Sequence, residues 1–311
     1  MGRLLPVVWA TVFLSAALAF SVQPLVARML LPLLGGTAQV WNTCLMFFQG
    51  TLLLGYFWAH ISTQIRGPRW QALAHLSIVA AAGLALPIGL ATNAEPPGHS
   101  SPLLWQLIML TTLVGAPFLA LSATAPMLQR WLSSTQSKEG KDPYFLYAAS
   151  NLGSLIALIA YPLIVEPAAG LSTQSHYWAW GYGAFFILLG ATVAFIWRQN
   201  HATPEPMERD IAQPTLYTRL HWLTLAFVPS SFLLALTTHL TEELPPIPLL
   251  WIIPLALYLA SFVIVFARKR VISHALMVRI QPLLLTTLAI ILFVPVRISG
   301  FFLHLTAFFV T

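Results

Sequence analysis

The sequence has 311 residues, of which 58% are hydrophobic and only 8% are charged. An ordinary soluble domain carries about 25% charged residues, so a water-facing surface is excluded and most of the surface must face lipid. The net charge of +6 comes from basic residues dispersed among the loops without a dense basic face, which argues against a nucleic-acid partner.

Apolar stretches long enough to cross a bilayer follow one another along almost the whole chain. A spanning helix needs about 20 residues. Such stretches lie at 7–32, 39–61, 70–92, 103–131, 144–166, 177–197, 220–241, 248–267 and 273–296, and a tenth begins near Ile298. The sequence therefore predicts an all-α, polytopic membrane helix bundle of about nine to ten transmembrane helices, with the lipid bilayer as its first partner.

The basic residues predict the orientation, because lysine and arginine in short loops favour the cytoplasmic side. The side of the N-terminus holds twelve of the fifteen: Arg3; Arg66 and Arg69; Arg130, Lys138 and Lys141; Arg198, Arg209 and Arg219; and Arg268, Lys269 and Arg270. The opposite side holds only Arg28 and Arg297. We therefore expect the N-terminus to be cytoplasmic.

The longest polar stretch divides the chain into two parts. We interpret 1–198 as a six-helix bundle, 199–219 as a cytoplasmic linker, and 220–311 as the start of a second, incomplete bundle. Six helices followed by a basic cytoplasmic linker is the layout of a major-facilitator-like transporter. This is an analogy of architecture, and by itself it does not establish a function.

Polar side chains inside spanning segments are expensive in lipid, which makes them candidates for a functional site. The candidates for lining a polar cavity are Gln23, Asn42, Gln49, Asn151 and Ser230. Each has an alternative role: Gln23 precedes a proline kink, and Asn42 and Gln49 lie seven residues apart, suitable for hydrogen bonds between helices. Asn151 lies on a small-residue packing face, and Ser230 follows Pro229 at a helix break.

Three charged residues share one depth at the predicted outer face. Arg28 lies 21 residues beyond Val7, and Glu166 and Glu242 each lie 22 residues beyond the start of their own segments. At 1.5 Å per residue all three are roughly 30 Å from the inner surface, so one of the carboxylates is the expected partner of Arg28. The cluster could form an outer gate or the mouth of a site, or its members could be solvated helix ends that never meet.

No residue pattern indicates a cofactor or metal site. The only cysteine, Cys44, lies in an apolar run, and no histidine pair has metal-ligand spacing. His75, His239 and His274 fall near helix ends, where we expect partly solvated imidazoles. The tryptophans interpreted as an interfacial belt at helix ends are Trp70, Trp131, Trp178, Trp197 and Trp222.

Several long runs resemble the bacterial family of fused major-facilitator-type transporters and spermidine synthases. These runs are FLSAALAFSVQPLVARMLLPLLGGTAQVWNTCLMFFQG from Phe13, FLALSATAPMLQRW from Phe118, DPYFLYAASNLGSLIALIAYPLIVEP from Asp142, and FVPSSFLLALTTHLTEELPPIPLLWIIPLALYLASFVIVFAR from Phe227. The resemblance implies a membrane portion of major-facilitator type in a bacterial inner (plasma) membrane. In the family it is joined to a C-terminal aminopropyltransferase-like domain.

The chain contains no segment that matches the synthase domain, so we expect no catalytic residue and no enzyme activity from these 311 residues. A full-length or partnered form could be a spermidine synthase-like aminopropyltransferase. The first functional hypothesis is movement of a small metabolite such as a polyamine. The alternative is a non-transporting anchor, a regulatory module or a subunit beside a synthase or other membrane proteins. No Asp or Glu falls at mid-bilayer depth, which weakens the hypothesis of a proton-coupled cation carrier.

Overall fold

The computed structural model of the chain describes residues 4–65, 67–90, 102–133, 145–198, 214–243, 252–265 and 273–293. Within these ranges every regular element is a helix, which confirms the all-α prediction for this part of the chain. Five of the helical stretches are long and apolar enough to cross a membrane: Leu5–Leu34, Gln39–Gln64, Pro102–Ser133, Phe145–Ala168 and Leu171–Phe195. The chain is therefore a helical membrane protein.

The chain divides into two compact units, the first covering Met1–Leu223. Its described residues up to Arg198 form six helical segments. They are α1 (Leu4–Leu34); α2 (Ala38–Ile61); α3 (Gly67–Gly83); α4 (Pro102–Leu110) continued through the π-helical turn Thr111–Gly115 into α5 (Ala116–Ser133); α6 (Phe145–Ala160) continued through the π-helical turn Tyr161–Val165 into α7 (Glu166–Ala168); and α8 (Leu171–Arg198).

Two of these segments have an end that differs from the prediction by more than five residues. The third helix was expected to reach residue 92, but α3 ends at Gly83 and residues 84–90 are not helical. Pro87 explains this end, because its ring would clash with the Gly83 carbonyl four residues earlier and it has no N–H to donate. The sixth helix was expected from residue 177, but α8 already begins at Leu171, where Gln174 and Ser175 are hydrogen-bonded to neighbouring segments.

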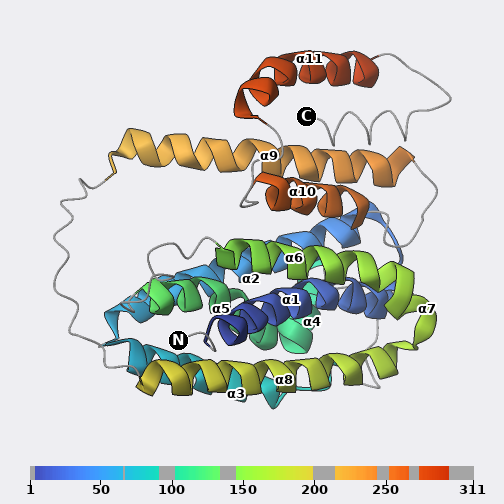
Figure 1. Cartoon of the computed structure of the whole chain (residues 1–311). Helices are drawn as coiled ribbons and strands as arrows, with labels where there is room; N and C mark the ends of the chain where they lie inside the picture. Colours follow the sequence, from blue (N-terminus) through green and yellow to red (C-terminus); the bar gives the residue numbers. More distant parts are fainter. Residues whose placement is uncertain are drawn as a thin grey trace. The chain divides into compact units, whose positions relative to one another are not determined.

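The first helix is the central element of the first unit. α1 (dark blue in Figure 1) lies between α6 and α8 and also packs against α5. Its fully buried side chains include Val12, Val22, Val26 and Leu30. Lipid tails are as apolar as these side chains, so close packing and interhelical hydrogen bonds must hold the helices together inside a bilayer.

Glycines make two of the helix crossings unusually close. A Cβ atom at Gly153 of α6 would overlap the carbonyl oxygen of Phe13 in α1. A Cβ atom at Gly55 of α2 would lie 2.6 Å from the Cβ of Ser122 in α5. At both crossings a larger residue would push the two backbones apart, so the glycines permit the contact.

The outer surfaces of the helices are apolar. On α2, Leu53 is 69% exposed and Phe57 is 58% exposed. On α8, Ile187 is 71% exposed. Such a surface would favour aggregation in water, but it suits contact with lipid chains.

The second unit covers Thr224–Thr311. Its described helices are the greater part of α9 (Leu216–Glu243), which begins in the first unit, then α10 (Ile252–Val265) and α11 (His274–Phe293). Pro229 lies inside α9 and Pro282 inside α11. The tenth segment expected near Ile298 lies outside the described residues, as does most of the linker predicted at 199–219.

Candidate functional site

The structure brings two of the three predicted charged residues together at one end of the first unit. The Nη2 atom of Arg28, in α1, lies 2.8 Å from Oε1 of Glu166, the first residue of α7. The two side chains are 30% and 23% exposed, respectively, so the pair is partly shielded from its surroundings. The charge-assisted contact satisfies an arginine that would otherwise have to extend out of the membrane.

The third predicted member of this cluster is Glu242. It falls near the end of α9, in the second unit, and its side chain lies outside the described residues. Glu166 is therefore the carboxylate that the structure assigns to Arg28.

A buried polar network continues from the same end of the bundle. Tyr161, in the π-helical turn before Glu166, donates a hydrogen bond to Oε1 of Gln174 in α8 over 2.8 Å. The Gln174 amide donates in turn to the Ala169 carbonyl over 2.7 Å. Ser175 donates to the Ile88 carbonyl, which belongs to the non-helical segment after α3. These contacts fix the fifth segment, α8 and residues 84–90 to one another, and they explain why α8 starts early.

The location of the ion pair bears on its role. α1 and α6 pack against each other within one compact unit. The Arg28–Glu166 pair joins the same two segments, whose backbones also meet closely at Gly153 and Phe13. The geometry suits a clamp that holds two helices of one bundle better than a gate between two bundles.

The five candidates for a polar cavity lie in different surroundings. Gln23 is buried, and its amide donates to the Ala19 carbonyl of its own helix over 3.2 Å. Ser230 likewise donates to the Ala226 carbonyl over 2.8 Å. Asn42 and Asn151 are half-buried, whereas Gln49 is exposed on α2. Gln23 and Ser230 thus use their polar groups on their own helices beside a proline, which supports the kink alternative for these two positions.

Sequence reasoning missed a buried polar cluster between α3 and α5. His75 is 0% exposed, and its Nε2 lies 3.0 Å from Oγ1 of Thr124. The indole of Trp131 donates to Oε1 of Gln71 over 3.3 Å. The expectation of a partly solvated His75 is wrong, because α3 packs this face against α5 and α8. A usable signal was present: Gln71 and His75 are four residues apart, so they share one helix face.

The interfacial interpretation of the tryptophans is also wrong at two positions. Trp131 is 1% exposed and Trp178 is 5% exposed, so both belong to the core of the first unit. The Trp178 indole donates to the Leu18 carbonyl of α1 over 3.0 Å. Trp70 and Trp222, in contrast, are more than half exposed, as an interfacial belt requires.

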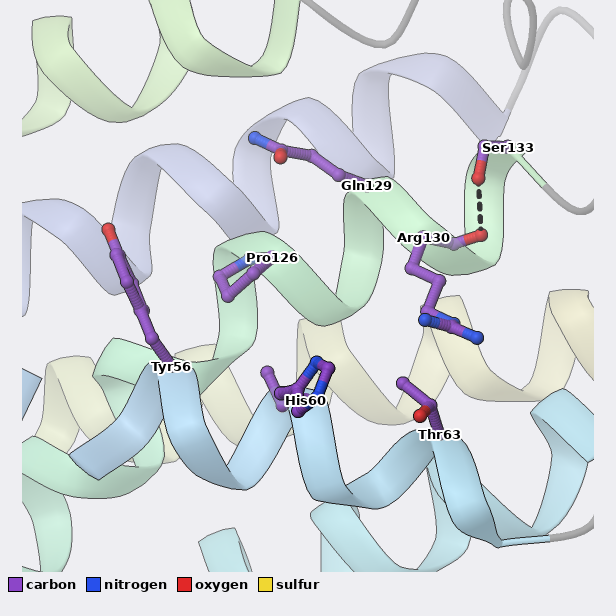
Figure 2. Close-up of a pocket in the computed structure, with 8 residues that line it drawn as sticks. Tyr56, His60, Thr63, Pro126, Gln129, Arg130 and Ser133 are labelled. Carbon is purple, nitrogen blue, oxygen red and sulfur yellow. Dashed lines mark hydrogen bonds between the residues drawn. The ribbon is translucent and has the colours of Figure 1, made fainter. Parts of the chain in front are cut away.

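A cavity of about 390 Å³ opens between the last turns of α2 and α5. It is lined by Tyr56, Ala59, His60, Thr63, Pro126, Gln129, Arg130 and Ser133. Figure 2 shows Arg130 extending from α5 toward His60 on α2 and Thr63 in the 3-10 turn that follows α2. Ser133 donates its hydroxyl hydrogen to the Arg130 carbonyl over 2.8 Å. Among the described residues, no three His, Cys, Asp or Glu side chains gather closely enough to hold a metal ion, here or elsewhere.

Comparison with known proteins gives no match among protein-family models, curated proteins or solved structures. Membership of a family is therefore not shown by similarity. The grounds for a function are the helix packing and the polar groups described above.

Proposed function

We propose that this chain is a membrane module of major-facilitator type that moves a small metabolite across a bacterial inner membrane. The coarser part of this proposal, a membrane-embedded helical protein, rests on the five apolar helices of spanning length. The major-facilitator part of the proposal rests on one observation, the pattern in which the six segments of the first unit pair.

Each six-helix half of a major-facilitator protein consists of two inverted repeats of three helices. Such a repeat relates the first segment to the fourth, the second to the fifth and the third to the sixth. Under this exchange, each pair of packed segments should become another pair of packed segments, and here it does. The first segment packs on the fifth (α1 on α6), and the second packs on the fourth (α2 on α5). The first also packs on the sixth (α1 on α8), and the third packs on the fourth (α3 on α5).

The remaining pairs obey the same exchange. The first segment packs on the fourth and the third on the sixth, and each of these pairs maps onto itself. The smaller contacts of the first with the second (α1 on α2) and of the fourth with the fifth (α5 on α6) are exchanged with one another. The two glycine crossings are also related, because Gly55 belongs to the second–fourth contact and Gly153 to the first–fifth contact. A simple up-and-down bundle pairs each helix with its neighbours in sequence, so this pattern supports the repeat architecture.

A polyamine is the first substrate to test, because several long runs resemble the membrane portion of the fused transporter and spermidine synthase family. A polyamine is a cation, and the sequence has no carboxylate at mid-bilayer depth to pair with it. In such a carrier aromatic faces would have to hold the cation.

The missing carboxylate favours a second candidate function, a non-transporting anchor or regulatory module for a synthase or another membrane subunit. Such a module needs the same helical scaffold but no charged group to take up a proton or a cation. The two candidates differ in one measurable property, which is solute movement across a sealed membrane.

Uptake of radiolabelled putrescine and spermidine into liposomes containing the purified chain would test the carrier proposal. We expect saturable uptake above that of protein-free liposomes, and competition by the unlabelled polyamine. Uptake no greater than in protein-free liposomes would refute a polyamine carrier and support the non-transporting module. The same preparation should transfer no aminopropyl group from decarboxylated S-adenosylmethionine to putrescine, and turnover would contradict our assignment of the chain as a membrane module alone.

A further inference from the structure

The cavity between α2 and α5 has an unusual chemical lining for a membrane bundle. Its lining residues include Arg130, His60 and Thr63, and Figure 2 shows the Arg130 guanidinium directed toward the other two. These three side chains can donate hydrogen bonds, and no carboxylate lines the cavity. Its volume of about 390 Å³ lies within the range of small-molecule sites.

The positive charge in this cavity is not neutralised by the described part of the chain. Among the described residues the recorded ion pair joins Arg28 to Glu166, and no carboxylate is paired with Arg130. Arg130 lies near the end of α5, and the next segment begins at Phe145 and reaches Glu166 only at its far end. Glu166 therefore lies at the opposite face of the membrane from Arg130. An anion in the cavity would therefore meet the Arg130 guanidinium without competition from a carboxylate of the described residues.

The length of the helices places the cavity among lipid headgroups. The continuous helix Pro102–Ser133 has 32 residues, so it extends roughly 48 Å at 1.5 Å per residue. The hydrocarbon core is about 30 Å thick, and the bilayer with its headgroups is about 40–45 Å thick. Arg130, in the last turn of this helix, lies at the level of the phosphates rather than of the acyl chains.

Helix dipoles give a simpler reason for the two basic side chains. Arg130 and His60 each lie in the last turn of a helix, where a positive group interacts favourably with unpaired carbonyl groups. This explains their positions along α5 and α2. It does not explain why both side chains, from different helices, border one open cavity together with Thr63.

We propose that this cavity binds a phosphate group, either that of an anionic phospholipid headgroup or that of a soluble phosphate ester. The Arg130 guanidinium offers paired N–H donors that match two phosphate oxygens. His60 and Thr63 supply further donors from the α2 side. The Ser133 hydroxyl hydrogen is already donated to the Arg130 carbonyl, so Ser133 lines the cavity without donating a hydrogen bond to the phosphate. Basic pockets between transmembrane helices on the cytoplasmic side are typical lipid-headgroup sites.

Thermal unfolding of the purified chain in a neutral detergent, followed by tryptophan fluorescence, would test the site. The probes are short-chain phosphatidylglycerol, short-chain phosphatidylcholine and glycerol phosphate. We expect phosphatidylglycerol to raise the unfolding midpoint in a saturable manner and phosphatidylcholine to do so much less. Arg130→Gln should weaken the apparent affinity by at least about tenfold, since a charge-assisted hydrogen bond is lost.

Arg69→Gln is the matched control, because it removes the same charge from α3 without altering the cavity wall; Arg69 instead lies over the Trp197 ring, 5.6 Å from its centroid. Its apparent affinity should stay within about twofold of the unmodified chain, well inside the loss expected for one charged hydrogen bond. An Arg130-dependent response to glycerol phosphate would identify a soluble ester as the source of the phosphate, whereas a response to phosphatidylglycerol alone would identify lipid. An equal response of Arg130→Gln and Arg69→Gln, or no response to either anionic probe, would overturn the proposal.

Discussion

Two arginines of the first unit lie in contrasting electrostatic surroundings. Arg28 has a carboxylate 2.8 Å away, whereas Arg130 borders an open cavity that no carboxylate lines. His75 shows a third situation, because its ring is fully buried and bonds Thr124 through one nitrogen while Nδ1 has no partner among the described residues. The surroundings of each charged or polar group in this unit therefore differ, and so does the expected effect of replacing it.

The ion pair between Arg28 and Glu166 predicts a charge-swap result. Arg28→Glu should lower the thermal unfolding midpoint, because two carboxylates then face each other where an attractive pair stood. Glu166→Arg in the same chain should restore part of the loss. The coupling free energy should be about 0.5–1 kcal/mol, since both side chains are partly exposed and such pairs are weak.

The measurement is the unfolding midpoint of the single and double variants in detergent. Arg279→Glu supplies the control, because this exposed residue of α11 has no ion pair recorded among the described residues. Purely additive effects of Arg28→Glu and Glu166→Arg would show that the pair contributes nothing to stability.

At the scale of helices, close approach is the main structural device. α1 and α6 meet where Gly153 faces the Phe13 backbone, and α2 and α5 meet where Gly55 faces Ser122. Because the hydrophobic effect does not drive helices together inside lipid, the stability of these contacts depends on how closely the backbones fit. The π-helical turns Thr111–Gly115 and Tyr161–Val165 locally change the helix register within the fourth and fifth segments.

Alanine at Gly153 should disrupt the contact between α1 and α6. The new methyl group would overlap the Phe13 carbonyl oxygen, and backbone cannot move aside as a flexible side chain can. We expect a loss of roughly 1–3 kcal/mol in unfolding free energy, as for other overpacked positions.

Gly183 provides the matched control for this substitution. It lies inside α8, and a Cβ atom there would meet nothing within 4 Å. Gly183→Ala should leave stability unchanged or raise it by up to about 1 kcal/mol, because alanine is the better helix former. If both variants unfold at the same midpoint in tryptophan fluorescence, the close crossing is not important for stability.

At the scale of the whole molecule, the helices and the basic residues together predict a membrane orientation. Ser133 ends α5 beside Arg130, and Thr173 lies in the first turn of α8, and both residues are exposed. If basic loops are cytoplasmic, Ser133 is on the inner side and Thr173 on the outer side.

Cysteine labelling in intact cells would measure this orientation. Thr173→Cys should react with a membrane-impermeant thiol reagent, and Ser133→Cys should react only after the membrane is broken. The parent chain serves as background, because its own Cys44 is buried and only 5% exposed. Labelling of Ser133→Cys but not Thr173→Cys in intact cells would invert the topology.

The sequence alone determined that this is a helical membrane protein, and it located the helical segments that the structure describes. Apolar length is a local property that any stretch of about 20 residues carries by itself. Its two largest errors at helix ends, after Gly83 and before Tyr177, came from a proline and from polar residues whose partners lie in other segments. Depth arithmetic also placed Arg28 and Glu166 at one level. Only the tertiary structure decided that these two meet, that His75 is buried, and that His60 and Arg130 border one cavity. These facts depend on which helix faces pack together, and that is fixed by close contacts such as those at Gly55 and Gly153 rather than by the composition of any single helix.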